Sequence, residues 1–356
     1  MTTPADSGPV PSSVFTAPIR TGLIGFGLSG RIFHAPFIAL DPRFSLDAIV
    51  TSDAGRQAEA RDEYPDTVIL DSTAELFEKA DDLDLVVIGS PPGSHYGLAL
   101  AAINAGLSVV IDKPFAASVA QATELIERAE QLGVALTVFQ NRRWDGDFLT
   151  LRTLLDEGAL GEVYRFESRF EWWKPQGGRD WKGEVTVPEG GGILFDLGSH
   201  LTDQALQLFG PVDEVYSEVA TRLPGGSADD DVFVALRHVS GVTSHLWMNS
   251  LAAQKGARFH VLGSTGAYTK WGLDGQEDAL RSGARPADEG FGVEPESTWG
   301  QLGVDGSLTR RPTEPGDYAG FYRVLGDALT TGSALPVDPR SSLQALAIIE
   351  QIHARG

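Results

Sequence analysis

The stretch Ile19-Arg20-Thr21-Gly22-Leu23-Ile24-Gly25-Phe26-Gly27-Leu28-Ser29-Gly30 decides how the rest of this sequence is interpreted. An apolar run enters the pattern Gly-x-Gly-x-x-Gly. Gly25 permits a tight bend, Gly27 leaves no side chain between the main chain and a pyrophosphate, and Gly30 lets the following helix pack against its strand. The N-terminus of that helix adds a partial positive charge. The stretch therefore predicts a strand, a turn and a helix that bind a dinucleotide.

Length and composition limit the kinds of protein that the chain can be. Its 356 residues are enough for two domains of about 100 to 200 residues each. A formal net charge of -21 disfavours nucleic acids and anionic membranes as partners, because their phosphates would be repelled. The absence of cysteine excludes disulfides, thiolate metal sites and cysteine nucleophiles. Residues 1–17 have the composition of a flexible tail rather than a signal peptide, and no apolar run reaches the roughly 18 residues of a membrane span. We expect a cytoplasmic protein.

The first part of the chain alternates short apolar runs with segments of helical period. This alternation predicts a doubly wound parallel sheet, which we assign to a dinucleotide-binding domain over residues 18–142. The expected strands are 19–24, 46–51, 68–70, 85–88, 108–111 and 135–139, and the clearest helices are 94–105 and 118–132.

The second part, residues 143–356, has a different pattern. Apolar and polar residues alternate with a period of two in 164–172, 232–236, 242–248 and 259–262, which is typical of strands with one solvated face. This predicts an α+β domain with a large, mostly antiparallel open sheet. Residues 272–311 are rich in Gly, Asp and Pro and predict a long loop. The expected helices are 148–156, 197–208, 318–330 and 340–353.

Ligands of open parallel sheets bind at the carboxyl ends of the strands. The second strand is followed by Thr51, Ser52, Asp53 and Arg56. An acidic residue here selects NAD through the ribose, whereas hydroxyls with an arginine accept the 2'-phosphate of NADP, so the choice between the two cofactors stays open. The fourth strand is followed by Gly89-Ser90-Pro91-Pro92-Gly93-Ser94-His95, whose small residues would let a nucleotide lie against the main chain. A proline-shaped turn with Ser94 as helix cap explains this run equally well. The contacts predicted from it are Ser90, Pro91 and His95.

Two further places carry candidate catalytic residues. Lys113, after the fifth strand, would direct its ammonium at a substrate hydroxyl or the cofactor ribose; the alternative is a surface lysine. Asp196 and His200 are four residues apart at an expected helix start, so both face one side, and the imidazole is suited to taking a proton. A capping aspartate beside a partly buried histidine is the alternative. A metal site that also uses Asp203 is disfavoured, because the spacing matches no structural metal motif.

Together these motifs resemble the family of glucose-fructose oxidoreductase, inositol dehydrogenase and MocA, from Arg20 onward. The glycine turn is followed by Phe33-His34-Ala35-Pro36, Asp112-Lys113-Pro114 stands where the family usually has Glu-Lys-Pro, and 196–200 carry the aspartate and histidine. The runs Asn141-Arg142-Arg143-Trp144-Asp145 and 272–280 resemble a narrower bacterial subgroup that includes scyllo-inositol dehydrogenases.

The resemblance implies an NAD(P)-dependent dehydrogenase of a sugar or polyol. His200 would be the general base, Lys113 would hold the hydroxyl, and Asp196 would orient the site. Asp53 stands where relatives that use NADP carry an arginine. The predicted cofactor contacts are Gly25, Phe26, Gly27, Leu28, Ser29, Gly30, Thr51, Ser52, Arg56, Ser90, Pro91, His95, Asp112, Lys113 and Asn141. The predicted substrate contacts are Arg143, Trp144, Trp173, Arg179 and Trp181, and no metal is expected.

The resemblance and the solvated sheet face also predict a homodimer or homotetramer. Two other functions are considered. One is a dinucleotide-binding sensor without turnover, which would have no need of a proton acceptor. The other is a metal-dependent hydrolase, which would leave the glycine turn unexplained.

Overall fold

The computed structural model describes residues 14–176, 186–187 and 190–355. They form two compact units. The first comprises Met1–Asn141, Glu277–Phe291 and Tyr318–Leu343, and the second comprises Arg142–Gln276, Gly292–Asp317 and Gln344–Gly356. The sequence pattern predicts that everything from residue 143 onward lies in the second domain, whereas residues 277–291 and 318–343 lie in the first unit.

The first unit is built on a parallel sheet with the strand order β3-β2-β1-β4-β5-β6. This is the doubly wound order of a Rossmann fold, so the predicted fold class is confirmed. The strands are β1 (Ile19–Ile24), β2 (Phe44–Val50), β3 (Val68–Leu70), β4 (Leu85–Ile88), β5 (Ser108–Asp112) and β6 (Leu136–Phe139).

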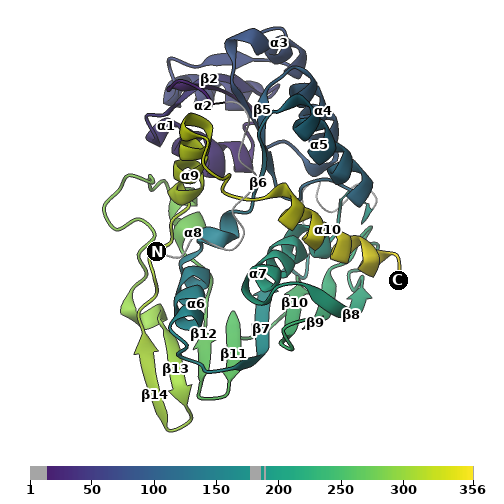
Figure 1. Cartoon of the computed structure of the whole chain (residues 1–356), viewed down its shortest axis with the longest axis vertical. Coiled ribbons are helices and arrows are strands. Elements are labelled where there is room, and N and C mark those ends of the chain that lie inside the picture. Colours follow the sequence, from purple (N-terminus) through teal and green to yellow (C-terminus); the bar gives the residue numbers. More distant parts are fainter. Residues whose placement is uncertain (1–13, 177–185, 188–189, 356) are drawn as a thin grey trace. The chain divides into compact units, whose positions relative to one another are not determined.

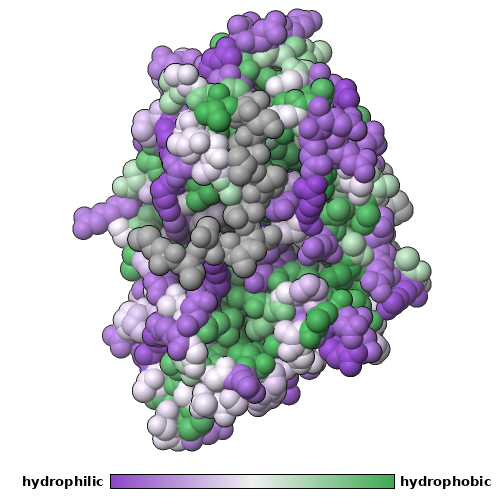
Figure 2. Space-filling view, viewed as in Figure 1, coloured by the Kyte–Doolittle hydropathy of each residue, from purple (hydrophilic) through white to green (hydrophobic). Residues whose placement is uncertain are grey.

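Helices separate these strands, and α4 and α5 lie side by side (Figure 1). On the face shown in Figure 2, hydrophilic residues predominate over these two helices. All four residues of β4 are buried, as expected of a central parallel strand. The helices of this part are α1 (Ala35–Leu40), α2 (Ala54–Glu63), α3 (Thr73–Phe77), α4 (His95–Asn104), α5 (Val119–Leu132) and α9 (Ala319–Thr331), with the short turns η1 (Gly30–His34), η2 (Ala80–Asp82) and η3 (Pro92–Ser94).

The second unit is built on an eight-stranded sheet with the order β14-β13-β12-β11-β7-β10-β9-β8. Only the pairing of β10 with β7 is parallel, so the sheet is mostly antiparallel, as predicted. The strands are β7 (Val163–Glu171), β8 (Val212–Ala220), β9 (Asp231–His238), β10 (Thr243–Asn249), β11 (Phe259–Gly263), β12 (Ala267–Lys270), β13 (Gly300–Val304) and β14 (Ser307–Arg311).

One face of this sheet is covered by helices, among them α7 (Ser199–Phe209), which contacts β7 and β10 (Figure 1). Phe166, Ser168 and Phe170 of β7 are buried, while the residues between them are partly exposed. The remaining elements are α6 (Gly146–Asp156), α8 (Gln276–Arg281), α10 (Pro339–His353), η4 (Asn141–Trp144), η7 (Leu194–Gly198) and η8 (Glu296–Thr298). In the part of the chain that the structure describes, no helix is long and apolar enough to span a membrane.

The prediction of a long loop over 272–311 was wrong in part, because this segment contains α8, β13 and β14. β13 and β14 form an exposed hairpin at the edge of the sheet, where glycines and polar residues are tolerated because little apolar surface is buried. β8 was also not predicted. It is the other edge strand, and all of its residues are exposed or partly exposed, so it lacks the alternation that marks a half-buried strand.

Candidate functional site

The glycine turn has the close approaches that its sequence predicts. A Cβ on Gly30 would lie 1.9 Å from the carbonyl oxygen of Gly25, and Gly25 itself has a φ of +96°. A Cβ on Gly27 would meet only the guanidinium of Arg56, at 3.6 Å. The first and last glycines are therefore needed for the turn, whereas Gly27 leaves open the space beside the main chain. A close approach of this kind to the main chain is what a pyrophosphate requires.

The polar residues that follow β2 differ in their exposure and in their contacts. Thr51 is buried, and Ser52 is exposed. The carboxylate of Asp53 caps α2 by accepting a hydrogen bond of 2.8 Å from the amide of Arg56. Arg56 is exposed, and its side chain extends to Gly27 of the glycine turn. After β2, the Asp53 carboxylate thus caps the start of α2, while the Arg56 guanidinium lies beside the glycine turn.

Asp112 connects the glycine turn to Lys113. One of its carboxylate oxygens accepts a hydrogen bond from the hydroxyl of Ser29, and the other accepts a bond of 2.8 Å from the amide of Lys113. Lys113 is partly exposed at the carboxyl end of β5, and its peptide bond to Pro114 is cis. An aspartate side chain is therefore long enough to link the glycine turn with the loop that carries Lys113.

His34, which follows the turn, is a fully buried histidine. Its Nδ1 lies 2.7 Å from the hydroxyl of Tyr322, and its Nε2 lies 4.0 Å from Asp112. Burial lowers the pKa of His34 to about 4, although the Asp112 carboxylate opposes this shift. Burial also raises the pKa of Tyr322 well above its usual value. Both side chains are uncharged at neutral pH, so this pair anchors the end of η1 without burying a charge.

His95 lies between two of the loops predicted to bind the cofactor. Only 1% of it is exposed, and its Nδ1 and Nε2 each lie 2.9 Å from a main-chain oxygen, those of Pro114 and Ser90. The ring therefore connects the loop after β4 with the loop after β5. Pro91 is exposed and Ser90 is partly exposed, so these residues rather than the imidazole present surface to a ligand.

In the second unit, Asp196 lies in the π-helical turn η7, and His200 lies in the first turn of α7. Asp196 is partly exposed, and only 4% of His200 is exposed. The His200 ring packs edge-on against Phe170 of β7, with 6.2 Å between ring centroids. Wide π-helical turns are frequent at functional sites. Here the turn shifts the register between the aspartate and the histidine.

Arg143 and Asp203 form a buried ion pair. The guanidinium Nε and Nη2 donate to the two carboxylate oxygens at 2.8 and 2.6 Å, and the two side chains are 7% and 2% exposed. Asp203 lies on α7 one residue before Gln204 and three after His200. The pair therefore fixes the helix that carries His200. Because Asp203 is paired in this way, its carboxylate is committed to a guanidinium rather than to a metal site with Asp196 and His200.

A second buried arginine, Arg258, reaches the same helix and was not predicted from the sequence. It donates to Gln204 at 2.8 Å, to Asp147 of α6 at 3.2 Å and to the hydroxyl of Ser168. Its guanidinium also lies over the ring of Phe170, 4.3 Å from the centroid. Burial lowers the pKa of Arg258, and Asp147 opposes this shift. The arginine thus joins α6, α7 and β7.

The run 272–280 contributes a buried carboxylate, Asp274. It accepts hydrogen bonds of 2.8 Å from the amides of Gly146, at the start of α6, and of Gln276. Burial raises the pKa of Asp274, and it raises the pKa of the neighbouring Asp145 well above its usual value. Asp274 therefore caps α6, which explains why an aspartate stands in this run.

The predicted substrate contacts lie in different environments. Trp144 is partly exposed, and Trp173 is 56% exposed and bridges to Leu251. Asn141, a predicted cofactor contact, is 6% exposed. Arg179 and Trp181 lie outside the described residues. Among the residues that the structure describes, no group of three or more His, Asp or Glu side chains is arranged to hold a metal ion.

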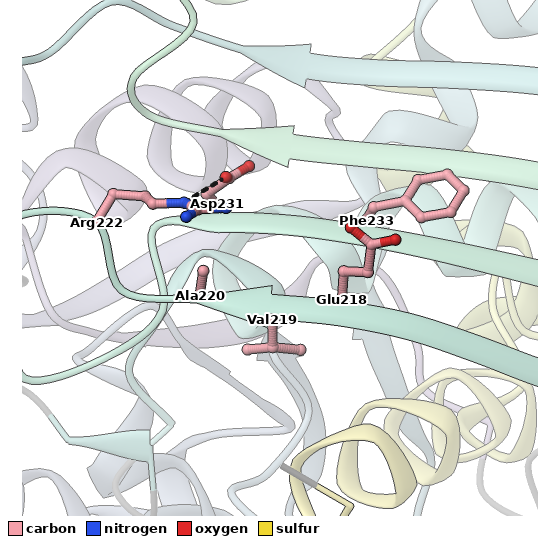
Figure 3. Close-up of a pocket in the computed structure, with 6 residues that line it drawn as sticks. All are labelled: Glu218, Val219, Ala220, Arg222, Asp231 and Phe233. Carbon is pink, nitrogen blue, oxygen red and sulfur yellow. Dashed lines mark hydrogen bonds and ion pairs between the residues drawn. The ribbon is translucent and has the colours of Figure 1, made fainter.

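A small pocket lies on the sheet face opposite α7. Figure 3 shows Glu218 and Phe233 on one side of their strands and the side chain of Val219 pointing away from them. Arg222 and Asp231 form an ion pair of 3.0 Å at its edge. The residues that line it are Glu218, Val219, Ala220, Arg222, Asp231 and Phe233. It is separate from the residues discussed above, since these strand positions alternate with the buried Val232 and Val234.

Both units contain a segment that matches a known protein-family model. Residues 19–140 match the model of the oxidoreductase family with an NAD-binding Rossmann fold, and residues 148–269 match the GFO/IDH/MocA C-terminal domain. The chain belongs to the Gfo/Idh/MocA oxidoreductase family. The resemblance seen in the sequence is confirmed, and this Gfo/Idh/MocA protein is an NAD(P)-dependent oxidoreductase whose first unit is the cofactor-binding domain.

Similar relatives cover almost all of the chain. The oxidoreductase YdgJ of Escherichia coli is 40% identical over 93% of this chain and 94% of its own length. The scyllo-inositol 2-dehydrogenase (NADP(+)) IolW of Bacillus subtilis is 32% identical over 93% of this chain and 92% of its own. Among solved structures, the oxidoreductase yvaA of Bacillus subtilis has a TM-score of 0.90 at 30% identity, covering 96% of each chain.

Proposed function

We propose that this Gfo/Idh/MocA protein oxidises a secondary hydroxyl of a sugar or polyol of the inositol type. The observation that carries the proposal is the Asp112 link, which ties the backbone of Lys113 to Ser29 in the glycine turn. This link between the main chain of Lys113 and the glycine turn supports a role for the Lys113 side chain in holding the hydroxyl that is oxidised. The similarity to a protein named scyllo-inositol 2-dehydrogenase supports this substrate class.

The reaction removes a hydride and a proton from one alcohol group. The nicotinamide, when bound, supplies the carbon that accepts the hydride. The Lys113 ammonium donates a hydrogen bond to the hydroxyl oxygen and favours its loss of a proton. His200 accepts that proton at an imidazole nitrogen, so that the alcohol becomes a ketone and the imidazole becomes imidazolium. Asp196, at the turn before His200, stabilises the imidazolium or binds a neighbouring hydroxyl.

We further propose that NADP is preferred over NAD. The Asp53 carboxylate is used to cap α2 through the Arg56 amide, while the Arg56 guanidinium lies beside Gly27. A guanidinium in this place can pair with a 2'-phosphate, and the hydroxyls of Thr51 and Ser52 can add hydrogen bonds. Asp53 was the reason to doubt NADP, and its capping role supports setting that doubt aside.

Turnover can be tested with purified protein, a panel of inositols, sugars and sugar derivatives, and NAD or NADP. We expect reduction of the cofactor by at least one polyol, with His200→Ala abolishing turnover while cofactor binding stays nearly intact. Lys113→Met should lower kcat by about a hundredfold or more. Lys79→Met, at an exposed lysine of the same unit, is the matched control.

Cofactor fluorescence distinguishes the other candidate function. A sensor without turnover would bind NADPH and reduce no cofactor with any substrate in the panel. Wild-type rates in His200→Ala would show that the base is a different residue. The absence of any fluorescence change with both NADH and NADPH would contradict the whole oxidoreductase assignment.

We also propose that the chain forms a homodimer or homotetramer through the open face of its eight-stranded sheet. That face carries an aromatic and charged cluster, in which Phe233 and Trp247 lie 5.0 Å apart and Arg169 covers Trp247 at 3.9 Å. Such amphipathic side chains are typical of interfaces. A sedimentation mass of 38.1 kDa at micromolar concentration would contradict this. The cytoplasmic location stays a prediction.

A further inference from the structure

The glycine run before the π-helical turn η7 packs directly on a buried carboxylate, that of Asp229. The amide of Ile193 donates to the main-chain oxygen of Asp229 at 2.9 Å, and the amide of Leu194 donates to its carboxylate at 2.7 Å. Gly192 has a φ of +98°, and a Cβ there would lie 2.3 Å from an Asp229 carboxylate oxygen. The glycine is thus required for Asp229 to reach the first amide of η7.

A histidine from the end of the chain contacts the same carboxylate. His353, the last residue of α10, has its Nε2 3.1 Å from the other Asp229 oxygen. Its ring stacks on Phe195 of η7, with 5.2 Å between centroids and 23° between planes. The side chain of Asp229 is 2% exposed and that of His353 is 14% exposed. Both therefore act on η7 from within the packed interior.

We propose that Asp229 and His353 are positioning residues that hold Asp196 and His200 in their working geometry. Asp229 binds the amide two residues before Asp196, and His353 packs on the residue between them. A carboxylate at this end also suits the positive end of the helical segment. Displacement of a reacting group by about 1 Å can lower a rate by about a hundredfold, so support of this kind affects chemistry more than folding. The inference rests on the proposed function of Asp196 and His200.

The positioning role is tested on the full-length protein by measuring amide hydrogen exchange at Leu194 together with kcat and KM. His353→Phe keeps an aromatic ring on Phe195 and removes the contact with Asp229. We expect the Leu194 amide to exchange about tenfold faster and kcat to fall about tenfold, with KM changed less than about threefold. NADPH affinity should be unchanged. Asp229→Asn should retain most of the rate, because an amide still accepts from Leu194, whereas Asp229→Ala should not.

The control is Arg355→Ala, which removes another contact at the same end of the chain, the 2.9 Å bond from Arg355 to the main-chain oxygen of Val215. Unchanged Leu194 exchange in His353→Phe, or an equal rise in Arg355→Ala, overturns the proposal. Faster exchange with wild-type kcat overturns it as well. A wild-type protein that oxidises no polyol would instead refute the proposed function, and the exchange of Leu194 would still decide whether His353 holds η7.

Discussion

Replacement of Arg143 by glutamine separates two roles for this arginine, a contact with substrate and a support of the helix that carries His200. In the structure, two guanidinium nitrogens donate to both oxygens of Asp203, at 2.8 and 2.6 Å, and the side chains are 7% and 2% exposed. Removing one partner of such a buried pair leaves an uncompensated charge, which costs about 3–5 kcal/mol. For a unit of this size each kcal/mol lowers Tm by about 2–4 °C, so we expect a decrease of about 6–20 °C.

Scanning calorimetry measures this decrease, with Arg237→Gln as the matched control. Arg237 pairs with Asp213 in the same unit at 2.7 Å, but both side chains are more than half exposed, so its loss should cost less than about 1 kcal/mol. The double variant Arg143→Gln/Asp203→Asn should recover part of the lost stability, since it leaves no charge behind. If Arg143→Gln melts like Arg237→Gln while KM rises, the arginine contacts substrate and the supporting role is refuted.

Two further predictions concern the first unit. Because His34 is neutral in the folded protein down to about pH 4 but takes up a proton near pH 6.5 when unfolded, it should reduce the free energy of unfolding by about 3 kcal/mol as the pH falls from 6.5 to 4. Chemical denaturation should therefore show the stability advantage over His34→Gln shrinking by this amount on acidification, and an advantage independent of pH would contradict the assigned cause. Arg56→Gln should weaken NADPH binding by about ten- to hundredfold and NADH binding by less than about threefold, since only the former carries a 2'-phosphate. Fluorescence titration measures both, with Arg61→Gln on the same helix as the control, and an equal loss for both cofactors would argue against NADP preference.

The fold could be predicted because its signals are local. Continuous apolar runs with caps between them identify the parallel sheet, and the period of two in β7, β9 and β10 identifies the second sheet. The segments that return to the first unit could not be predicted in the same way. The apolar face of α9 could be buried equally well in either unit, and its own residues do not indicate which sheet that face covers.

In the candidate site too, residues with a local sequence signal could be predicted, and residues defined by distant partners could not. The glycine turn could be predicted from its Gly-x-Gly-x-x-Gly pattern, and Lys113 became a candidate because parallel strands place their carboxyl ends at one edge. Arg258 was missed because its partners are 54, 90 and 111 residues away, and a single arginine before a strand resembles a solvated residue. Asp229 is missed for the same reason, since it stands in the acidic run 229–231 that resembles an exposed turn. The buried charges become visible only when the tertiary partners are known.

Because the first unit is made of three separate stretches of chain, cutting the enzyme after its N-terminal stretch would not yield a complete unit. Thr137 of β6 donates to the main-chain oxygen of Val337, Phe139 packs on Phe321, and His34 bonds to Tyr322. A fragment that ends at Asn141 would keep the whole cofactor motif and all six parallel strands, yet it would expose one side of its own core. We therefore expect the N-terminal stretch to be less stable alone than with the segments that return to it, although residues 19–140 match a family model by themselves.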